Sequence, residues 1–313
     1  MTTTCQELKK LHKTSFDEIF EEYNFYSGKA SLYQKLVGIE VSIIEDDNEL
    51  LYNPEIRMKN IKTVILCGGV GYRLKEETEF KPKPMIEIGE RPILWHIMKI
   101  YAHFGFRDFI IALGYKGNLI KDYFMNKKFY DGDFTLDYSR KKVKHHKSED
   151  NDNFNITFVD TGLESLTGER LRRVQKYIKG DKFMVTYGDG LADINVGDLV
   201  KFHKGKKTVG TVTGVHPILK YGGLDEKGGH VVDFERKAKI RHLINGGFMV
   251  FSKKVFKYIP ANSMIEDVFE VLIAKKQLSC FLHKGFFHAM DTYQDVTDLN
   301  EMWKENPAWK IWR

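Results

Sequence analysis

The pattern of apolar and polar positions divides most of the chain into alternating strands and helices. Short apolar runs predict strands, and apolar residues at helical spacing predict helices between them. In the first half, strands are expected at 63–67, 108–114, 155–162 and 181–190, with helices at 91–105, 117–127 and 168–180. Shorter strands follow at 207–215, 228–236 and 246–252, and a last helix at 292–305. Such alternation is typical of βαβ units, and it predicts an α/β fold with a mixed, mainly parallel sheet and helices on both faces.

Residues 1–57 stand apart from this alternation. Ser15 and Glu18 have the spacing of a capping box before a short helical pattern, and a hairpin-like stretch follows before Pro54. No chemical motif falls in this region. The expected organisation is a small appended N-terminal element over 1–57 and one domain over 58–313.

Composition changes this picture little. Hydrophobic residues make up 42% of the chain and charged residues 29%, as in ordinary soluble globular proteins. No apolar run approaches the roughly 18 residues of a membrane helix, so no membrane partner is expected. The three cysteines (Cys5, Cys67 and Cys280) are far apart, which suggests neither a disulfide framework nor a zinc site. A reducing cytoplasm is the expected location.

The net charge of +6 raises the question of nucleic-acid binding. The one dense basic run, at 141–147, is followed at once by the acidic stretch 149–152, and we interpret it as a self-neutralising surface loop. No zinc-finger, RRM or KH pattern accompanies it. We therefore expect no nucleic-acid partner, whereas small phosphorylated ligands fit the charge equally well.

The strongest chemical signal lies directly after the first predicted strand. Gly68, Gly69, Gly71, Arg73 and Lys83 fall within the stretch LCGGVGYRLKEETEFKPKPM. Glycines at a strand end let backbone N–H groups approach phosphate closely, because no Cβ intervenes. Each proline beside Lys83 fixes its own φ and favours extended geometry before it, so we expect Lys83 on a stiff, extended arm.

Two familiar phosphate-binding templates do not fit this stretch. A Walker A loop requires a Gly-Lys pair, which is absent. The dinucleotide fingerprint requires a third glycine where Leu74 stands. A tight glycine turn without a ligand stays an alternative when the glycines are considered alone.

Together with later segments, however, this stretch resembles the sugar-1-phosphate nucleotidyltransferases, and among them the glucose-1-phosphate cytidylyltransferases. The resemblance covers about residues 61–313. The matching segments are LCGGVGYRL (66–74), KPKPMIEIGERPILWHIMKIY (81–101), GYKG (114–117), FVDTG (158–162), TGERLRRV (167–174), TYGDGLAD (186–193), INGGF (244–248), MDT (290–292) and PAWKIW (307–312).

The resemblance implies a Rossmann-like nucleotidyltransferase fold, and a reaction that joins CTP and a sugar 1-phosphate into a CDP-sugar with release of pyrophosphate. It implies that Asp189 and Asp291 bind Mg²⁺, that Arg73, Lys83 and Asp189 are catalytic, and that the protein is a homo-oligomer. The implied nucleotide-binding residues are Leu66, Cys67, Gly68, Gly69, Gly71, Tyr72, Arg73, Lys83, Thr161, Thr167, Arg170 and Gly188. The implied acceptor-binding residues are Tyr187, Arg236, Lys237, Asn245, Gly246 and Gly247.

Three positions depart from the family pattern. Tyr72 replaces the usual Thr beside the glycine loop, and Glu169 replaces a Gly, adding negative charge near the expected cytosine-binding segment. Arg236 replaces the sugar-contacting Glu, while Lys237 keeps the phosphate-binding cation. The alternative is a shifted register in which Glu235 takes the sugar-facing role and Arg236 points to solvent. A carboxylate accepts hydrogen bonds from sugar hydroxyls, whereas a guanidinium only donates.

These departures leave two alternatives beside glucose 1-phosphate cytidylyltransfer. One is a cytidylyltransferase for a different, more anionic phosphorylated acceptor. The other is a catalytically weakened homologue that binds nucleotide for regulation, against which the retained Arg73, Lys83, Asp189 and Asp291 argue. Single residues elsewhere give a weaker signal of chemical function. Cys67 is interpreted as a packing residue, and the four tryptophans as packing or interface residues.

Overall fold

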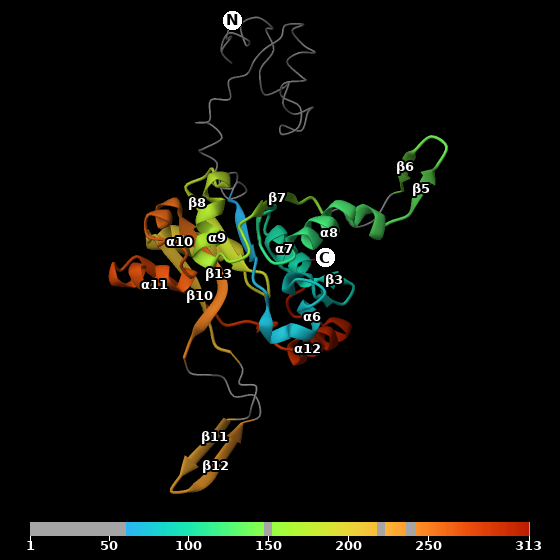
Figure 1. The fold of residues 1–313 in the computed structure, drawn as a ribbon. Coiled ribbons are helices and arrows are strands. Elements are labelled where there is room, and N and C mark those ends of the chain that lie inside the picture. Colours follow the sequence, from blue (N-terminus) through green and yellow to red (C-terminus); the bar gives the residue numbers. More distant parts are fainter. Residues whose placement is uncertain (1–60, 147–151, 218–222, 236–241, 313) are drawn as a thin grey trace, which may run out of the picture. The chain divides into compact units, whose positions relative to one another are not determined.

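The computed structural model describes residues 61–146, 152–217, 223–235 and 242–312 (Figure 1). The predicted element over 1–57 lies outside these residues, as do Arg236 and Lys237. Within the described chain, no helix combines the length and apolar content needed to cross a bilayer.

A seven-stranded sheet forms the centre of the domain. Its strand order is β14-β10-β13-β8-β1-β4-β7, and β13 runs antiparallel to both its neighbours while the other pairs are parallel. The predicted mixed, mainly parallel sheet is thus confirmed. The strands are β1 (Thr63–Cys67), β4 (Asp108–Leu113), β7 (Asn155–Asp160), β8 (Lys182–Tyr187), β10 (Gly210–Val215), β13 (Ile244–Ser252) and β14 (Leu278–His283).

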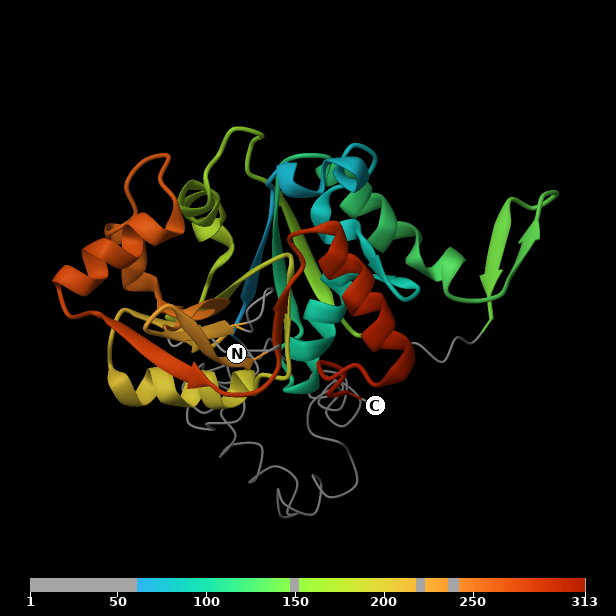
Figure 2. The same cartoon turned by 90° about the horizontal axis from the view of Figure 1, so that it is seen from below.

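Helices cover both faces of the sheet, as predicted. Successive side chains of β1 point to opposite faces, so they belong to two separate cores. Ile65 and Cys67 face one core with α7 (Ile93–His103), α8 (Gly117–Tyr130), α10 (Val196–Lys206) and α12 (Tyr293–Glu305). Val64 and Leu66 face a second core with α9 (Thr167–Val174) and α11 (Ile265–Ala274). Figure 2 shows the two sets of helices on opposite sides of the sheet.

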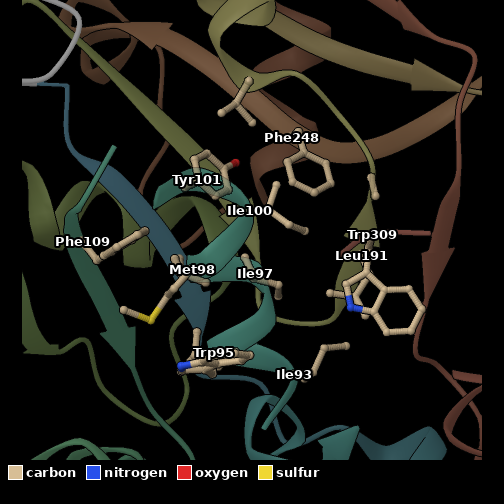
Figure 3. Packing of buried hydrophobic residues seen from close by; sticks show 14 of the residues in the cluster. Ile93, Trp95, Ile97, Met98, Ile100, Tyr101, Phe109, Leu191, Phe248 and Trp309 are labelled. Atoms are coloured by element: carbon tan, nitrogen blue, oxygen red, sulfur yellow. The ribbon is translucent and has the colours of Figure 1, made fainter. Parts of the chain in front are cut away.

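Helix α7 is central to the first core because nearly all of its side chains are buried. Figure 3 shows Ile93, Ile97 and Ile100 directed toward neighbouring core residues that include Leu191 and Trp309. Tyr101 stacks on Phe248 of β13 with ring centroids 5.9 Å apart. The helix ends at His103, two residues before its predicted end, and Gly105 follows the C-cap Phe104 with a φ of 86°.

The C-terminal segment packs on the same helix. The rings of Trp95, Trp303, Trp309 and Trp312 surround His96, with centroids between 4.8 and 6.1 Å from its ring. The interpretation of the tryptophans as packing residues is confirmed. His96 is fully buried, and burial lowers its pKa to about 4.

The remaining elements are short. Two-stranded sheets pair β2 (Glu87–Ile88) with β3 (Arg91–Pro92), β5 (Phe134–Asp137) with β6 (Lys142–His145), β9 (Gly190–Ala192) with β15 (Phe287–Ala289), and β11 (Gly223–Lys227) with β12 (His230–Glu235). Helix α6 spans Lys75–Thr78, and 3-10 helices span Tyr72–Leu74, Lys83–Met85, Gln175–Tyr177 and Lys253–Lys257.

The structure corrects several expectations. The helix predicted for 168–180 is α9, which ends at Val174 and continues only as the 3-10 turn Gln175–Tyr177. Much of the basic run predicted as a loop is the exposed strand β6 of a hairpin. Helices α10 and α11 and strand β14 were not predicted.

Candidate active site

The glycine loop leaves the carboxyl end of β1, where the strand order of the sheet reverses. Strands β4 and β7 lie on one side of β1, and β8 lies on the other. Ligands of open α/β sheets bind outside the strand ends at such a point. Gly188, directly after β8, packs here: a Cβ on it would lie 3.1 Å from Cys67 Sγ and 3.2 Å from Leu66 O.

Gly71 brings the loop close to Lys83. Its φ of 73° favours glycine, and a Cβ there would lie 3.3 Å from Lys83 Cβ. Thr78 Oγ1 donates to Gly71 O at 3.2 Å, which ties the loop to α6. In contrast, Tyr72 and Arg73 are exposed.

The backbone at Lys83 forms a turn, whereas its flanking prolines predict an extended conformation. Pro82 is extended, with a ψ of 149°, but Lys83 begins a 3-10 helix rather than an extended arm. The turn is closed by Met85 N–H donating to Pro82 O at 2.7 Å and Ile86 N–H to Lys83 O at 3.1 Å. These bonds compensate the unfavourable geometry before Pro84, and the side chain is still held firmly in place.

Two carboxylates from distant segments meet at this lysine. Lys83 Nζ lies 2.6 Å from Asp189 Oδ2 and 2.8 Å from Asp291 Oδ1. Asp189 follows β8, and Asp291 follows β15. The pairing of β9 with β15, extended by Met290 N–H donating to Asp189 O at 2.8 Å, brings the two aspartates side by side.

Electrostatics favour the charged form of Lys83. Burial alone would lower its pKa, but the contacts with Asp189 and Asp291 more than offset burial, so the pKa lies above its usual value. Lys83 is 14% exposed, whereas the two aspartates are 29% and 38% exposed. The carboxylates therefore remain accessible to an incoming cation or phosphate.

Arg73 adds a second, exposed cation beside the pair. Its Nη1 lies 3.6 Å from Asp291 Oδ2, and its side chain is 78% exposed. Because this ion pair is weak and exposed, little free energy is lost when Arg73 leaves Asp291 to contact a phosphate oxygen.

Asp295 holds Asp291 in place, and sequence reasoning missed it. Its Oδ2 accepts the N–H groups of Asp291 at 3.0 Å and Thr292 at 2.7 Å, as well as the Thr292 hydroxyl at 2.7 Å. Thr292 and Asp295 form the capping box of α12, a spacing that the sequence could have revealed. His288 Nε2 lies 3.2 Å from the other oxygen of Asp295.

Arg170 is buried beneath the glycine loop. Its guanidinium donates to backbone oxygens of Leu113, Gly162, Gly68 and Leu163 and to the Thr161 hydroxyl, at 2.6 to 3.1 Å. Burial lowers the pKa of Arg170. Thr161, in turn, donates its hydroxyl to Leu113 O at 2.6 Å. The Arg170 guanidinium thus connects the glycine loop, through Gly68, to Thr161 and the turn that follows β7.

The extra negative charge of Glu169 is neutralised locally. Arg172 donates two hydrogen bonds of 2.7 Å to its carboxylate, and Arg173 donates one of 2.8 Å. These contacts hold the pKa of Glu169 at about 2. The departure therefore adds no free charge beside Arg170.

The proposed acceptor residues form a second cluster at the end of β8. Tyr187 donates its hydroxyl to Glu266 Oε1 at 2.5 Å and accepts from Asn245 Nδ2 at 3.4 Å. Asn245 Oδ1 accepts the N–H of Gly247 at 3.0 Å. Gly247 has a φ of 80°, and a Cβ there would lie 2.9 Å from the Tyr187 ring. Gly246 packs against β10, since its Cβ would lie 2.8 Å from Val215 Cγ1.

Two further predicted residues have mainly structural contacts. Thr167 Oγ1 accepts the N–H of Ile265 at 2.9 Å and so connects α9 with α11. Cys67 is buried, and burial and the nearby Asp189 carboxylate raise the pKa of its thiol, so it stays protonated and suits packing rather than nucleophilic attack.

Taken together, the geometry suits phosphoryl chemistry. The carboxyl ends of the central strands carry accessible carboxylates that share a cation, a glycine loop with backbone N–H groups, and two arginines. The oxygens of Asp189 and Asp291 are hard ligands within reach of a single cation, as a divalent metal requires.

The comparisons with known proteins agree with this chemistry. Residues 62–310 match the family described as nucleotidyl transferase. The chain is 42% identical over 256 residues to the probable glucose-1-phosphate cytidylyltransferase of Bacillus subtilis (strain 168). It is 43% identical over 258 residues to the glucose-1-phosphate cytidylyltransferase of Salmonella typhimurium (strain LT2). Both alignments cover 80% of this chain and the whole relative.

A solved structure shares the fold. The crystal structure of HddC from Yersinia pseudotuberculosis superposes with a TM-score of 0.56 and 25% identity, covering 78% of this chain and 99% of that one. The family match and the two curated relatives together span nearly all of the described domain. The chain therefore belongs to the nucleotidyl transferase family, among the sugar-1-phosphate nucleotidyltransferases.

Proposed function

We propose that the protein joins CTP and glucose 1-phosphate to give CDP-glucose and pyrophosphate. The observation that carries this proposal is the pair Asp189 and Asp291 closing on Lys83 beside the glycine loop. The identity of 42–43% to glucose-1-phosphate cytidylyltransferases over the whole of those relatives supports CTP and glucose 1-phosphate as the substrates.

The reaction brings together two phosphate groups that repel each other. Attack on the α-phosphorus of CTP adds charge to its oxygens and to the leaving pyrophosphate, so positioning and electrostatics carry the catalysis. Lys83 is already charged, largely buried and aimed at the two carboxylates, so it suits the charge that develops. Arg73 is exposed at the same place and is free to follow a phosphate.

Mg²⁺ is the proposed metal of this site. Asp189 and Asp291 would hold it, and waters and substrate phosphates would complete its ligands. Bound there, it would neutralise phosphate charge during transfer. When it binds, Lys83 would release one or both carboxylates and turn toward the phosphates.

The glycine loop and Arg170 are proposed to bind the nucleotide. Backbone N–H groups from Gly68 to Gly71 offer donors to phosphate. Arg170 donates hydrogen bonds to five oxygens of the glycine loop and its neighbouring turns, so it would hold the loop in the shape that receives the nucleotide. A homo-oligomer in a reducing cytoplasm is the proposed setting.

Release of pyrophosphate with five nucleotides and a panel of sugar 1-phosphates tests the proposal. CTP with glucose 1-phosphate should give the highest kcat/KM, and ATP, GTP, UTP and dTTP should be poor substrates. In the same assay Lys83→Ala should lower kcat more than it raises KM for CTP, because the cation acts on developing charge. CTP binding without turnover of any acceptor would instead indicate a regulatory homologue.

A further inference from the structure

Glu266 lies in the cluster proposed to bind the sugar, although no motif of the sequence pointed to it. It stands in the first turn of α11, 79 residues from its partner Tyr187. Its Oε1 accepts the Tyr187 hydroxyl at 2.5 Å, a short, charge-assisted hydrogen bond. Tyr187 immediately precedes Gly188 and the metal-binding candidate Asp189, so this hydrogen bond connects Glu266 to the segment that carries Asp189.

The second oxygen of this carboxylate remains free to accept. Glu266 is exposed, and among the described residues Oε2 has neither a hydrogen-bond nor an ion-pair partner. A carboxylate offers about four lone-pair positions, and Tyr187 uses one of them. The contact with Tyr187 restricts the side chain, so less entropy is lost when a ligand binds.

The neighbouring groups offer few charged acceptors. Asn245 Oδ1 already accepts the N–H of Gly247, and Asn245 Nδ2 is a donor. Arg236, in sequence, stands where the family pattern has its sugar-contacting glutamate, and a guanidinium only donates. A carboxylate beside Tyr187 and Asn245 would supply the charged acceptor that a guanidinium cannot.

We propose that Glu266 is a specificity-determining residue whose free carboxylate oxygen accepts a hydrogen bond from one hydroxyl of the sugar 1-phosphate. This inference rests on the proposed function and deepens it: it assigns the acceptor contact to α11 instead of the segment around residue 236. It also explains how a neutral sugar is bound despite Arg236.

Steady-state kinetics of Glu266→Gln with CTP and glucose 1-phosphate test this inference. The amide keeps an oxygen for Tyr187 but removes the charge, so KM for glucose 1-phosphate should rise roughly ten- to a hundredfold. KM for CTP should stay within about twofold, because the nucleotide is bound elsewhere. Glu270→Gln, an exposed position one turn further along α11, is the matched control and should leave both constants unchanged.

Deoxy analogues separate a direct contact from a structural effect. Wild type and Glu266→Gln are compared with the 2-, 3-, 4- and 6-deoxy forms of glucose 1-phosphate. One analogue should have a much lower kcat/KM than glucose 1-phosphate with wild type. With Glu266→Gln the two substrates should have similar kcat/KM, because the variant no longer contacts that hydroxyl. Equal additional losses with all four analogues, or an unchanged KM in Glu266→Gln, would overturn the inference. If wild type does not turn over CTP with glucose 1-phosphate at all, the proposed function fails first.

Discussion

Lys83 Nζ and Asp291 Oδ1 lie 2.8 Å apart although 208 residues separate them in the sequence. The contact joins the glycine-loop segment to the turn before α12, and Asp189 lies on the same ammonium. The sheet and the β9–β15 pair bring these segments together, so the charge arrangement is a property of the whole fold.

Replacing either carboxylate should abolish most turnover without unfolding the protein. Asp189→Asn and Asp291→Asn remove one charge each from partly exposed positions, so stability should change little while kcat falls by orders of magnitude. Pyrophosphate release over a magnesium titration and thermal unfolding measure the two effects. Asp198→Asn, an exposed carboxylate on α10, is the control. Near-normal activity of a folded variant, or full wild-type activity in EDTA, would remove that residue or the metal from the mechanism.

Gly114→Ala should disturb the nucleotide loop through direct contact. An added Cβ would lie 2.6 Å from Gly68 O and 2.8 Å from Gly68 Cα, and these backbone atoms cannot rotate away. We expect a destabilisation of about 1–3 kcal/mol, as for overpacking, together with a raised KM for CTP. Denaturant unfolding and CTP kinetics check both.

The matched control for Gly114→Ala is Gly205→Ala. An added Cβ in this part of α10 meets nothing within 4 Å, so the substitution should stabilise the protein by about 0.4–1 kcal/mol. Loss of stability at both positions alike would contradict the steric explanation.

The stability of the protein should fall as the pH drops from about 6.5 to about 4, in part because of His96. Its Nε2–H donates to Ile88 O at 2.8 Å, and Trp309 Nε1 lies 3.4 Å from its Nδ1, an arrangement for a neutral ring. In the unfolded chain His96 takes up a proton with a pKa of about 6.5, whereas in the folded chain its pKa is about 4. The folded state therefore loses at most about 3 kcal/mol over this window, at 1.36 kcal/mol per pKa unit.

His96→Gln tests this origin. The variant should show a shallower fall in the free energy of unfolding between pH 6.5 and 4 than wild type, whatever its stability at pH 7. His103→Gln, at the exposed end of the same helix, should keep the wild-type slope. Identical slopes in wild type and His96→Gln would exclude His96 as the source.

The sequence allowed the sheet to be predicted because buried strands follow local apolar patterns, whereas the candidate site residues came from the family resemblance and stay a prediction. Apolar runs such as 63–67 and 108–113 form the buried strands β1 and β4, and the family motifs fall at their ends. Helix α11 was missed because a short, largely apolar run does not distinguish a helix from a strand.

Contacts made across the fold were beyond the sequence. The hydrogen bond between Glu266 and Tyr187, which are 79 residues apart, depends on where the fold places the two side chains. The neutralisation of Glu169 could have been predicted, because Arg172 and Arg173 follow it at the i,i+3 and i,i+4 spacing of helical ion pairs.

A chain beginning at Met58 should remain folded and active, because every residue assigned to the site lies downstream. Its thermal unfolding and its kcat/KM for CTP should match those of the full-length chain. Insolubility of the shortened chain would make residues 1–57 part of the core or of a subunit interface.

The fate of the α-phosphate of CTP tests the central claim most directly. With α-³²P-labelled CTP and glucose 1-phosphate, the label should appear in CDP-glucose, and the β- and γ-phosphates should leave together as pyrophosphate in equal amount. The Asp291→Asn variant should form neither product at a comparable rate. Label that stays in CTP or CMP, or a sugar product that carries the γ-phosphate instead, would contradict cytidylyl transfer by this site.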